Sequence, residues 1–142
     1  MTVSPTITYE HMPQPDDMAI VRAGLSAYNR HHAPDDVFQP LILFVRDAHG
    51  TIVGGLLGGT YWSWLYVESL WLSEEIRAHG YGSRLLAEAE RLAVERGCIA
   101  AQLDTMSFQA LAFYERHGYI IFGVLDNFPP GHRKYFLQKR LI

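Results

Sequence analysis

Apolar residues recur along the chain with two periods, one typical of helices and one typical of strands. Spacings of three and four residues place apolar side chains on one face of a helix. They predict three helices: Asp16–Arg30, Gly82–Arg96 and Ser107–His117. Ser107 belongs to the residue types that cap helix starts, and Gly97 and Gly118 follow the second and third helices as stop signals.

Runs rich in β-branched, aliphatic and aromatic residues predict the strands. These are residues 3–10, Leu41–Asp47, Thr51–Gly59, Tyr61–Leu72, Ile99–Asp104, Tyr119–Leu125 and Lys134–Leu141. The turn at residues 48–50 joins two of them into a hairpin, and the mostly apolar run Tyr61–Leu72 is predicted as one central strand. This order of strands and helices indicates a mixed α/β or α+β domain around one sheet.

Length and charge narrow the class of protein. The 142 residues, of which 49% are hydrophobic, fit one domain spanning residues 1–142 and exclude a disordered chain. The net charge of −3 disfavours binding to nucleic acid, which relies on an excess of positive charge. No apolar run reaches the roughly 18 residues that cross a membrane, and the first residues do not resemble an export signal. With one cysteine, Cys98, the expected location is the reducing cytoplasm.

Two glycines lie at the start of the second predicted helix, in the segment Ile76–Leu86. Gly80 and Gly82 can adopt positive φ and let a ligand approach the backbone, and Arg77 adds a positive charge. N–H groups at a helix start bind anions, so the segment suits a phosphate or pyrophosphate; a tight strand-to-helix connection is the alternative. The lysine of a P-loop is absent. A dinucleotide fingerprint would need a third glycine where Leu85 stands, which disfavours a nicotinamide-dependent oxidoreductase.

Two segments match the motifs of a known family in order and spacing. RAHGYG (77–82) resembles the signature Gln/Arg-x-x-Gly-x-Gly/Ala, and ALAFYERHGY (110–119) resembles Ala-x-x-Phe-Tyr-Glu-x-x-Gly-Phe, both of the GNAT superfamily of acetyl-CoA-dependent N-acetyltransferases. The hairpin DAHGTIVGGLLG (47–58) resembles the second and third strands of that family. The resemblance implies an α+β fold with a central mixed, mostly antiparallel sheet, a splayed parallel strand pair and flanking helices.

The same resemblance implies acetyl-CoA as the cosubstrate, and the spacing of the histidines gives no reason to expect a metal. Pantetheine would pair with the exposed backbone of Leu70, Trp71 and Leu72, opposite Gln102–Asp104, and a backbone N–H near Leu70 or Leu72 would polarise the acetyl carbonyl. Ser107 stands where the family often has an asparagine that binds pantetheine. The pyrophosphate would be held by the backbone amides of Arg77, Ala78, His79, Gly80, Tyr81, Gly82 and Ser83.

Tyr114 matches the family tyrosine that lies near the CoA sulfur. Its hydroxyl would give a hydrogen bond or a proton to the departing thiolate; packing on the sheet is the alternative. Cys98 has no paired histidine in its local sequence and is expected to be a buried packing residue. The seven histidines are scattered without the spacing of metal ligands.

Glu68 is the candidate base for the acceptor amine, because it is the one acid in the apolar run Tyr61–Leu72. An unpaired buried carboxylate is costly and needs a partner or a function. The family commonly has its glutamate two residues earlier, where Tyr66 stands, and the strand period keeps both positions on one face unless a bulge intervenes. The alternative is that Glu68 pairs with a neighbouring arginine or points to the sheet edge.

These features together predict an enzyme that moves acetyl from acetyl-CoA to an amine by direct attack. The acceptor is expected to be a small molecule, with a weak preference for a cationic or aromatic amine, although protein N-termini and lysines stay open. A non-catalytic acyl-CoA-binding regulatory module is the alternative from another class. A homodimer is plausible, but no residue requires it.

Overall fold

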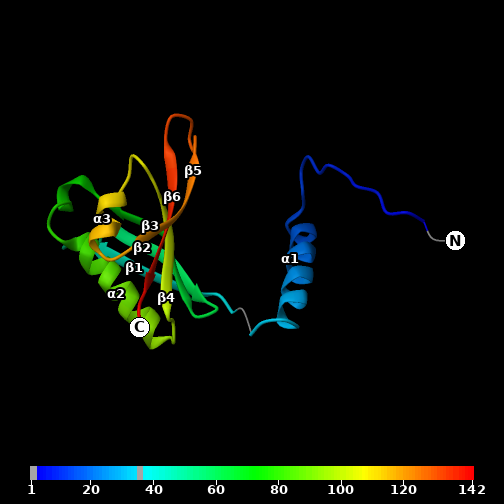
Figure 1. Cartoon of the computed structure of the whole chain (residues 1–142), viewed down its shortest axis with the longest axis horizontal. Coiled ribbons are helices and arrows are strands. Elements are labelled where there is room, and N and C mark those ends of the chain that lie inside the picture. Colours follow the sequence, from blue (N-terminus) through cyan, green and yellow to red (C-terminus); the bar gives the residue numbers. More distant parts are fainter. Residues whose placement is uncertain (1–2, 35–36) are drawn as a thin grey trace. The chain divides into compact units, whose positions relative to one another are not determined.

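The computed structural model describes residues 3–34 and 37–142, which fall into two compact units, residues 1–36 and residues 37–142 (Figure 1). The first unit contains helix α1 (Pro15–Arg30), as its periodicity predicts. Proline occupies its first turn with Asp16 and Asp17, which suits the positive end of the helix dipole. The strand predicted for residues 3–10 is wrong: these residues are exposed and form no strand, because alternation gives a strand only where a neighbour supplies hydrogen bonds. The single domain predicted for residues 1–142 stays a prediction.

The second unit is built on a six-stranded mixed sheet with the order β1-β2-β3-β4-β6-β5. Neighbouring strands run antiparallel, except for the parallel pair β3 and β4. This is the mixed α+β fold predicted from the sequence. The strands are β1 (Gln39–Arg46), β2 (Ile52–Tyr61), β3 (Trp64–Leu72), β4 (Ala100–Met106), β5 (Ile120–Asp126) and β6 (Arg133–Arg140). The helices are η1, a 3₁₀ turn (Glu74–Ile76), α2 (Tyr81–Glu95) and α3 (Leu111–Arg116).

The aromatic run 61–72 contains a hairpin turn, so its prediction as one strand is wrong. Strand β2 ends at Tyr61, and β3 begins at Trp64 and pairs back on it. The two connecting residues, Trp62 and Ser63, have φ of 49° and 64°, as in the two-residue turns that fit the twist of a hairpin. Such turns usually carry asparagine or glycine, so the sequence gives no signal here.

Helices α2 and α3 lie against one face of the sheet, as Figure 1 shows. Gly97 and Gly118 have φ of 90° and 89° just beyond these helices, which confirms both predicted stop signals. The N-cap predicted for Ser107 is wrong, because α3 begins four residues later, at Leu111. Among the described residues, the largest fully buried side chains are Leu41, Leu56, Leu65, Leu86, Leu137 and Cys98.

Glu90 connects α2 to strand β6 and to Tyr119, which precedes β5. Its carboxylate accepts hydrogen bonds of 2.8 Å from the Tyr119 hydroxyl and 2.8 Å from the Lys139 ammonium, and its side chain is 15% exposed. We expect Glu90→Ala to lower the free energy of unfolding by about 2 kcal/mol, because the buried Tyr119 hydroxyl and the partly buried Lys139 ammonium lose their acceptor.

Urea denaturation measures this loss, and Glu88→Ala is the matched control. Glu88 lies two residues earlier on the exposed side of α2, paired with Arg91 at 2.6 Å. Removing that exposed pair is expected to leave the denaturation midpoint unchanged. Equal midpoints for the two variants would contradict the structural role of Glu90.

Candidate active site

A cleft opens where the parallel strands β3 and β4 separate. Their pairing runs from Trp64 opposite Ala100 to Val67 opposite Leu103 and ends there. Beyond this point the strands enclose a cleft of about 590 Å³. Its lining residues are Val67, Glu68, Ser69, Leu70, Trp71, Leu72, Arg77, Asp104, Thr105, Phe108, Gln109, Ala110 and Tyr114. Two strands that diverge in this way leave backbone groups without a sheet partner, which a ligand can satisfy.

A β-bulge lies at Glu68, on the edge of the cleft. Ser69 pairs with Leu57 and Val67 with Gly58, so Glu68 is the extra residue of β3. Its side chain is exposed, and the premise that Glu68 is a buried carboxylate is therefore wrong. The bulge also breaks the strand period, so the expected alignment of positions 66 and 68 on one face does not follow. A catalytic role for Glu68 stays a prediction.

The backbone of Leu70 and Leu72 points into the cleft. The Ser73 N–H donates to the Val53 carbonyl at 2.8 Å, and in an antiparallel ladder every second residue bonds to the same neighbour. The backbone N–H and carbonyl groups of Trp71 therefore point toward β2, where Trp71 pairs with Gly55. The N–H and carbonyl groups of Leu70 and Leu72 point away from β2, toward the cleft. The Leu72 carbonyl accepts a hydrogen bond of 3.0 Å from Arg77 Nε, which holds Arg77 at the cleft.

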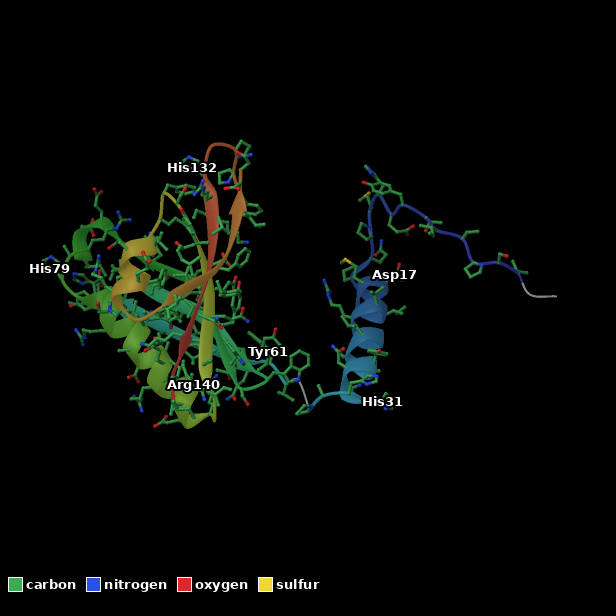
Figure 2. All side chains as sticks on the ribbon, in the orientation of Figure 1. Asp17, His31, Tyr61, His79, His132 and Arg140 are labelled. Carbon is green, nitrogen blue, oxygen red and sulfur yellow. The ribbon has the colours of Figure 1, made fainter. Side chains whose placement is uncertain are left out.

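The glycine loop, residues 77–82, leads into the first residues of α2. Gly80 has φ of 85° and caps the helix with its backbone, and Ala78, at φ of 62°, adopts the same left-handed region. The first helical hydrogen bond runs from the Arg84 N–H to the Gly80 carbonyl at 3.1 Å, so the three preceding N–H groups lie at the open helix end. As a glycine, the N-cap residue Gly80 has no side chain that could cap this end. His79 lies on the exposed loop before the helix (Figure 2).

Ser83 and Gly82 are held by α3. The Ser83 hydroxyl lies 2.9 Å from His117 Nε2, and His117 Nδ1 lies 2.8 Å from the Phe113 carbonyl. Because a carbonyl only accepts, Nδ1 carries the proton, and in the neutral ring Nε2 accepts from Ser83. A Cβ at Gly82 would meet the Phe113 ring at 3.4 Å, so α2 and α3 already pack at van der Waals distance there. Ser83 therefore offers a ligand its backbone N–H, since its hydroxyl is engaged.

Tyr114 lies in the cleft wall and is 6% exposed. Burial, and in second place the charge of Asp104, raise the pKa of its phenol above the usual value of 10.0. A phenol with a raised pKa stays protonated at neutral pH and can donate a hydrogen bond or a proton. Tyr114 and residues Leu70 and Leu72 of β3 thus line the same cleft, and the role of Tyr114 at the CoA sulfur stays a prediction.

Ser107 lies beside the cleft and is engaged elsewhere. Its hydroxyl accepts from the Arg133 N–H at 3.1 Å and lies 3.2 Å from His132 Nδ1, at the connection between β5 and β6 (Figure 2). Phe108 and Gln109, which sequence reasoning did not single out, line the cleft in its place. Gln109 is fixed by a hydrogen bond of 2.8 Å from the Met106 N–H. No motif marks these two residues, because they lie in the segment that the sequence assigns to a helix.

Three further sequence predictions concern Cys98, metal ions and membrane spans. Cys98 is 2% exposed, as predicted, and burial raises the pKa of its thiol. Within residues 3–34 and 37–142 no group of three or more histidine, cysteine, aspartate or glutamate side chains is arranged to hold a metal ion. In the same residues, each helix is too short or too polar to cross a membrane.

Comparisons with known proteins agree with this geometry. A blasticidin-S acetyltransferase from Streptomyces morookaense is 44% identical over 107 residues, covering 72% of this chain and 79% of the relative. Acetyltransferase Atu2258 from Agrobacterium fabrum is 38% identical over 120 residues, covering 84% and 88%.

Solved structures share the fold. The crystal structure of an acetyltransferase from Bacillus cereus ATCC 14579 superposes with a TM-score of 0.85 at 34% identity, covering 94% of this chain and 97% of that one. A structure from Bacillus anthracis, determined in complex with acetyl coenzyme A, has a TM-score of 0.62 at 24% identity and covers 80% and 67%. The model of the acetyltransferase (GNAT) family matches residues 9–119, and the chain with its splayed strands and glycine loop belongs to this family.

Proposed function

We propose that this protein transfers the acetyl group of acetyl-CoA to a primary amine of a small molecule. The observation that carries the proposal is the cleft between β3 and β4, which brings unpaired backbone groups together with a protonated tyrosine. The open start of α2 adjoins this cleft, since an added Cβ at Gly82 would lie 3.7 Å from the Leu72 side chain. Acetyl-CoA supplies a thioester whose acyl carbon is open to attack by an amine. The remaining roles belong to residues of this chain.

The donor half of the site is formed mainly by backbone. Leu70 and Leu72 would pair with pantetheine, whereas the backbone of Trp71 between them faces β2. The N–H of Leu70 or Leu72 would stabilise the negative charge that develops on the acyl oxygen. Ser107 would reach pantetheine only by giving up its contacts to the hairpin between β5 and β6. The N–H groups of the loop and helix start would bind the pyrophosphate, helped by the helix dipole. These residues are Arg77, Ala78, His79, Gly80, Tyr81, Gly82 and Ser83.

The acceptor half requires proton transfer. An amine arrives as ammonium and must lose a proton before its nitrogen attacks, and the exposed Glu68 at the bulge is the proposed proton acceptor. Tyr114 would donate to the sulfur as the C–S bond breaks. The relative named for blasticidin S makes that antibiotic the first acceptor to test. The homodimer and the cytoplasmic location stay predictions.

The test of this function has two parts. Calorimetric titration with acetyl-CoA, with NADH and dephospho-CoA as controls, should show binding of acetyl-CoA and none of NADH. Thiol release should then accompany turnover with blasticidin S or another amine of a panel that includes spermidine and an alanine-initiated peptide. Tight acetyl-CoA binding without turnover of any amine would favour a regulatory module, and turnover confined to the peptide would favour a protein N-acetyltransferase.

Gly80→Ala tests the helix start as the pyrophosphate site. An added Cβ meets nothing within 4 Å but projects from a residue at φ of 85°, so the loop must shift. We expect acetyl-CoA binding to weaken about tenfold, together with about 1 kcal/mol of lost stability from the strained φ.

Gly50→Ala is the matched control, because Gly50 has φ of 82° and the same open surroundings in the turn between β1 and β2. It should lose similar stability and keep its affinity for acetyl-CoA. Equal affinity in both variants would place the pyrophosphate elsewhere.

A further inference from the structure

Asp104 occupies a special position on β4. It is the first residue after the last one that pairs with β3, so it lies where the two strands part. Its neighbours Leu103 and Thr105 are buried on the helix-covered face, and strand alternation therefore places Asp104 on the opposite, outer face. Its side chain is 29% exposed and lines the cleft. A carboxylate at this point can meet a ligand that enters from the outer face.

The charge of Asp104 acts on hydroxyls from both sides of the sheet. It contributes, after burial, to the raised pKa of Tyr114, whose ring belongs to the helix-covered core. It contributes in the same order to the raised pKa of Tyr66, which lies on the outer face of β3. The carboxylate therefore lies within electrostatic reach of the proposed proton donor for the thiolate and of the outer mouth of the cleft.

Asp104 keeps its hydrogen-bonding capacity. Lys134 Nζ forms an ion pair with Oδ1 at 3.9 Å, which is too long for a hydrogen bond, and it also lies 4.7 Å from the centre of the Phe128 ring and 5.1 Å from that of Phe136. Within the described residues, Asp104 accepts no hydrogen bond. A half-buried carboxylate with free acceptor positions is a binding site for a cationic donor.

We propose that Asp104 binds the ammonium group of the acceptor at the outer mouth of the cleft, and so selects amines that are cations at neutral pH. The ring of Phe108 lines the same cleft and offers the cation an aromatic surface. This inference rests on the proposed function. It gives the two carboxylates different roles: Asp104 binds the ammonium group, and Glu68 accepts a proton from it.

The transfer balances with these residues. The ammonium nitrogen loses two protons: the first passes to Glu68 and on to solvent, which frees the lone pair that forms the C–N bond. The C–S bond breaks with its electron pair going to sulfur, and Tyr114 protonates the thiolate. Tyr114 regains a proton from the second N–H of the nitrogen. One amide, one thiol and one released proton result.

Asp104→Asn tests the inference, since it removes the charge and keeps the shape. With blasticidin S, or whichever amine the panel identifies, we expect KM to rise about 30-fold. The Kd for acetyl-CoA should stay within twofold, and Asp104→Glu should recover part of the loss. The preference of the unsubstituted protein for an alkylamine over an arylamine, which is neutral at pH 7, should disappear in Asp104→Asn.

Asp126→Asn controls for the charge change, because Asp126 is exposed and pairs with Arg133 outside the cleft. Its KM should equal that of the unsubstituted protein. A KM for Asp104→Asn within twofold of that value, or a parallel loss of acetyl-CoA affinity, would overturn the inference and leave the proposed function standing. Absence of turnover by the unsubstituted protein would overturn both.

Discussion

Replacing Tyr114 by phenylalanine should lower kcat about 10²-fold and leave the Kd for acetyl-CoA within twofold. The ring stays and its packing with Phe113 and Tyr119 is kept, so the change removes the hydroxyl alone. General acid catalysis contributes roughly 10²–10⁴-fold, and the loss should fall on the step in which the thiolate leaves. Single-turnover measurement with saturating acetyl-CoA reports that step directly.

The raised pKa of Tyr114 adds a pH signature. A phenol is the active donor in its protonated form, and a pKa above 10.0 keeps that form intact on the alkaline side. We therefore expect kcat to show no fall from Tyr114 below about pH 10. A descending limb between pH 8 and 9 that vanishes in Tyr114→Phe would contradict the assignment.

Tyr119→Phe is the matched control for Tyr114→Phe. The two rings lie 5.8 Å apart, but the Tyr119 hydroxyl donates to Glu90, outside the cleft. This variant should lose stability and keep kcat. Equal kcat losses in the two variants would indicate a packing effect rather than proton donation.

Leu70→Pro should lower kcat about 10²-fold by removing one N–H group from the cleft. Loss of a single donor to a developing oxyanion costs roughly 10²–10³-fold in enzymes of known mechanism. Proline is tolerated on a strand where the N–H faces away from the neighbouring strand, and Leu70 is such a position, since its N–H faces away from β2.

Leu70→Ala separates the backbone from the side chain. It keeps the N–H and removes part of the apolar contact with the core, so it should cost stability and leave kcat nearly unchanged. Circular dichroism and a thermal melt establish that both variants are folded. A folded Leu70→Pro variant with full activity would move the oxyanion donor to another group, with Leu72 the next to test.

The parts of the structure that depend on a glycine with positive φ could be predicted from the local sequence. Positive φ at Gly80, Gly97 and Gly118 is what glycine permits, so the loop before α2 and the ends of both core helices could be predicted from single residues. Tyr114 could be predicted because it belongs to a local motif, whose residue spacing can be recognised without knowing the surrounding fold.

Features that depend on pairing between distant segments left no such signal. The turn at Trp62 and Ser63 has the backbone of a glycine turn without glycine, and the bulge at Glu68 exists only in the register of β3 against β2. Alternation alone could not locate either feature, so Glu68 was expected to be buried. The delayed start of α3, which exposes Phe108 and Gln109 to the cleft, is set by side-chain bonds such as that of Gln109 to Met106.

The unpaired backbone of β3 also bears on how such a protein can change. Amide and carbonyl groups are common to every residue except proline, which lacks the amide hydrogen, so exchanging a side chain at Ser69 or Trp71 leaves the donor half of the cleft chemically intact. We therefore expect that substitutions which alter the choice of acceptor can accumulate one at a time, with each successive variant keeping its activity. A library randomised at these two positions should contain many active members with shifted substrate preference, which makes this strand a natural starting point for directed evolution.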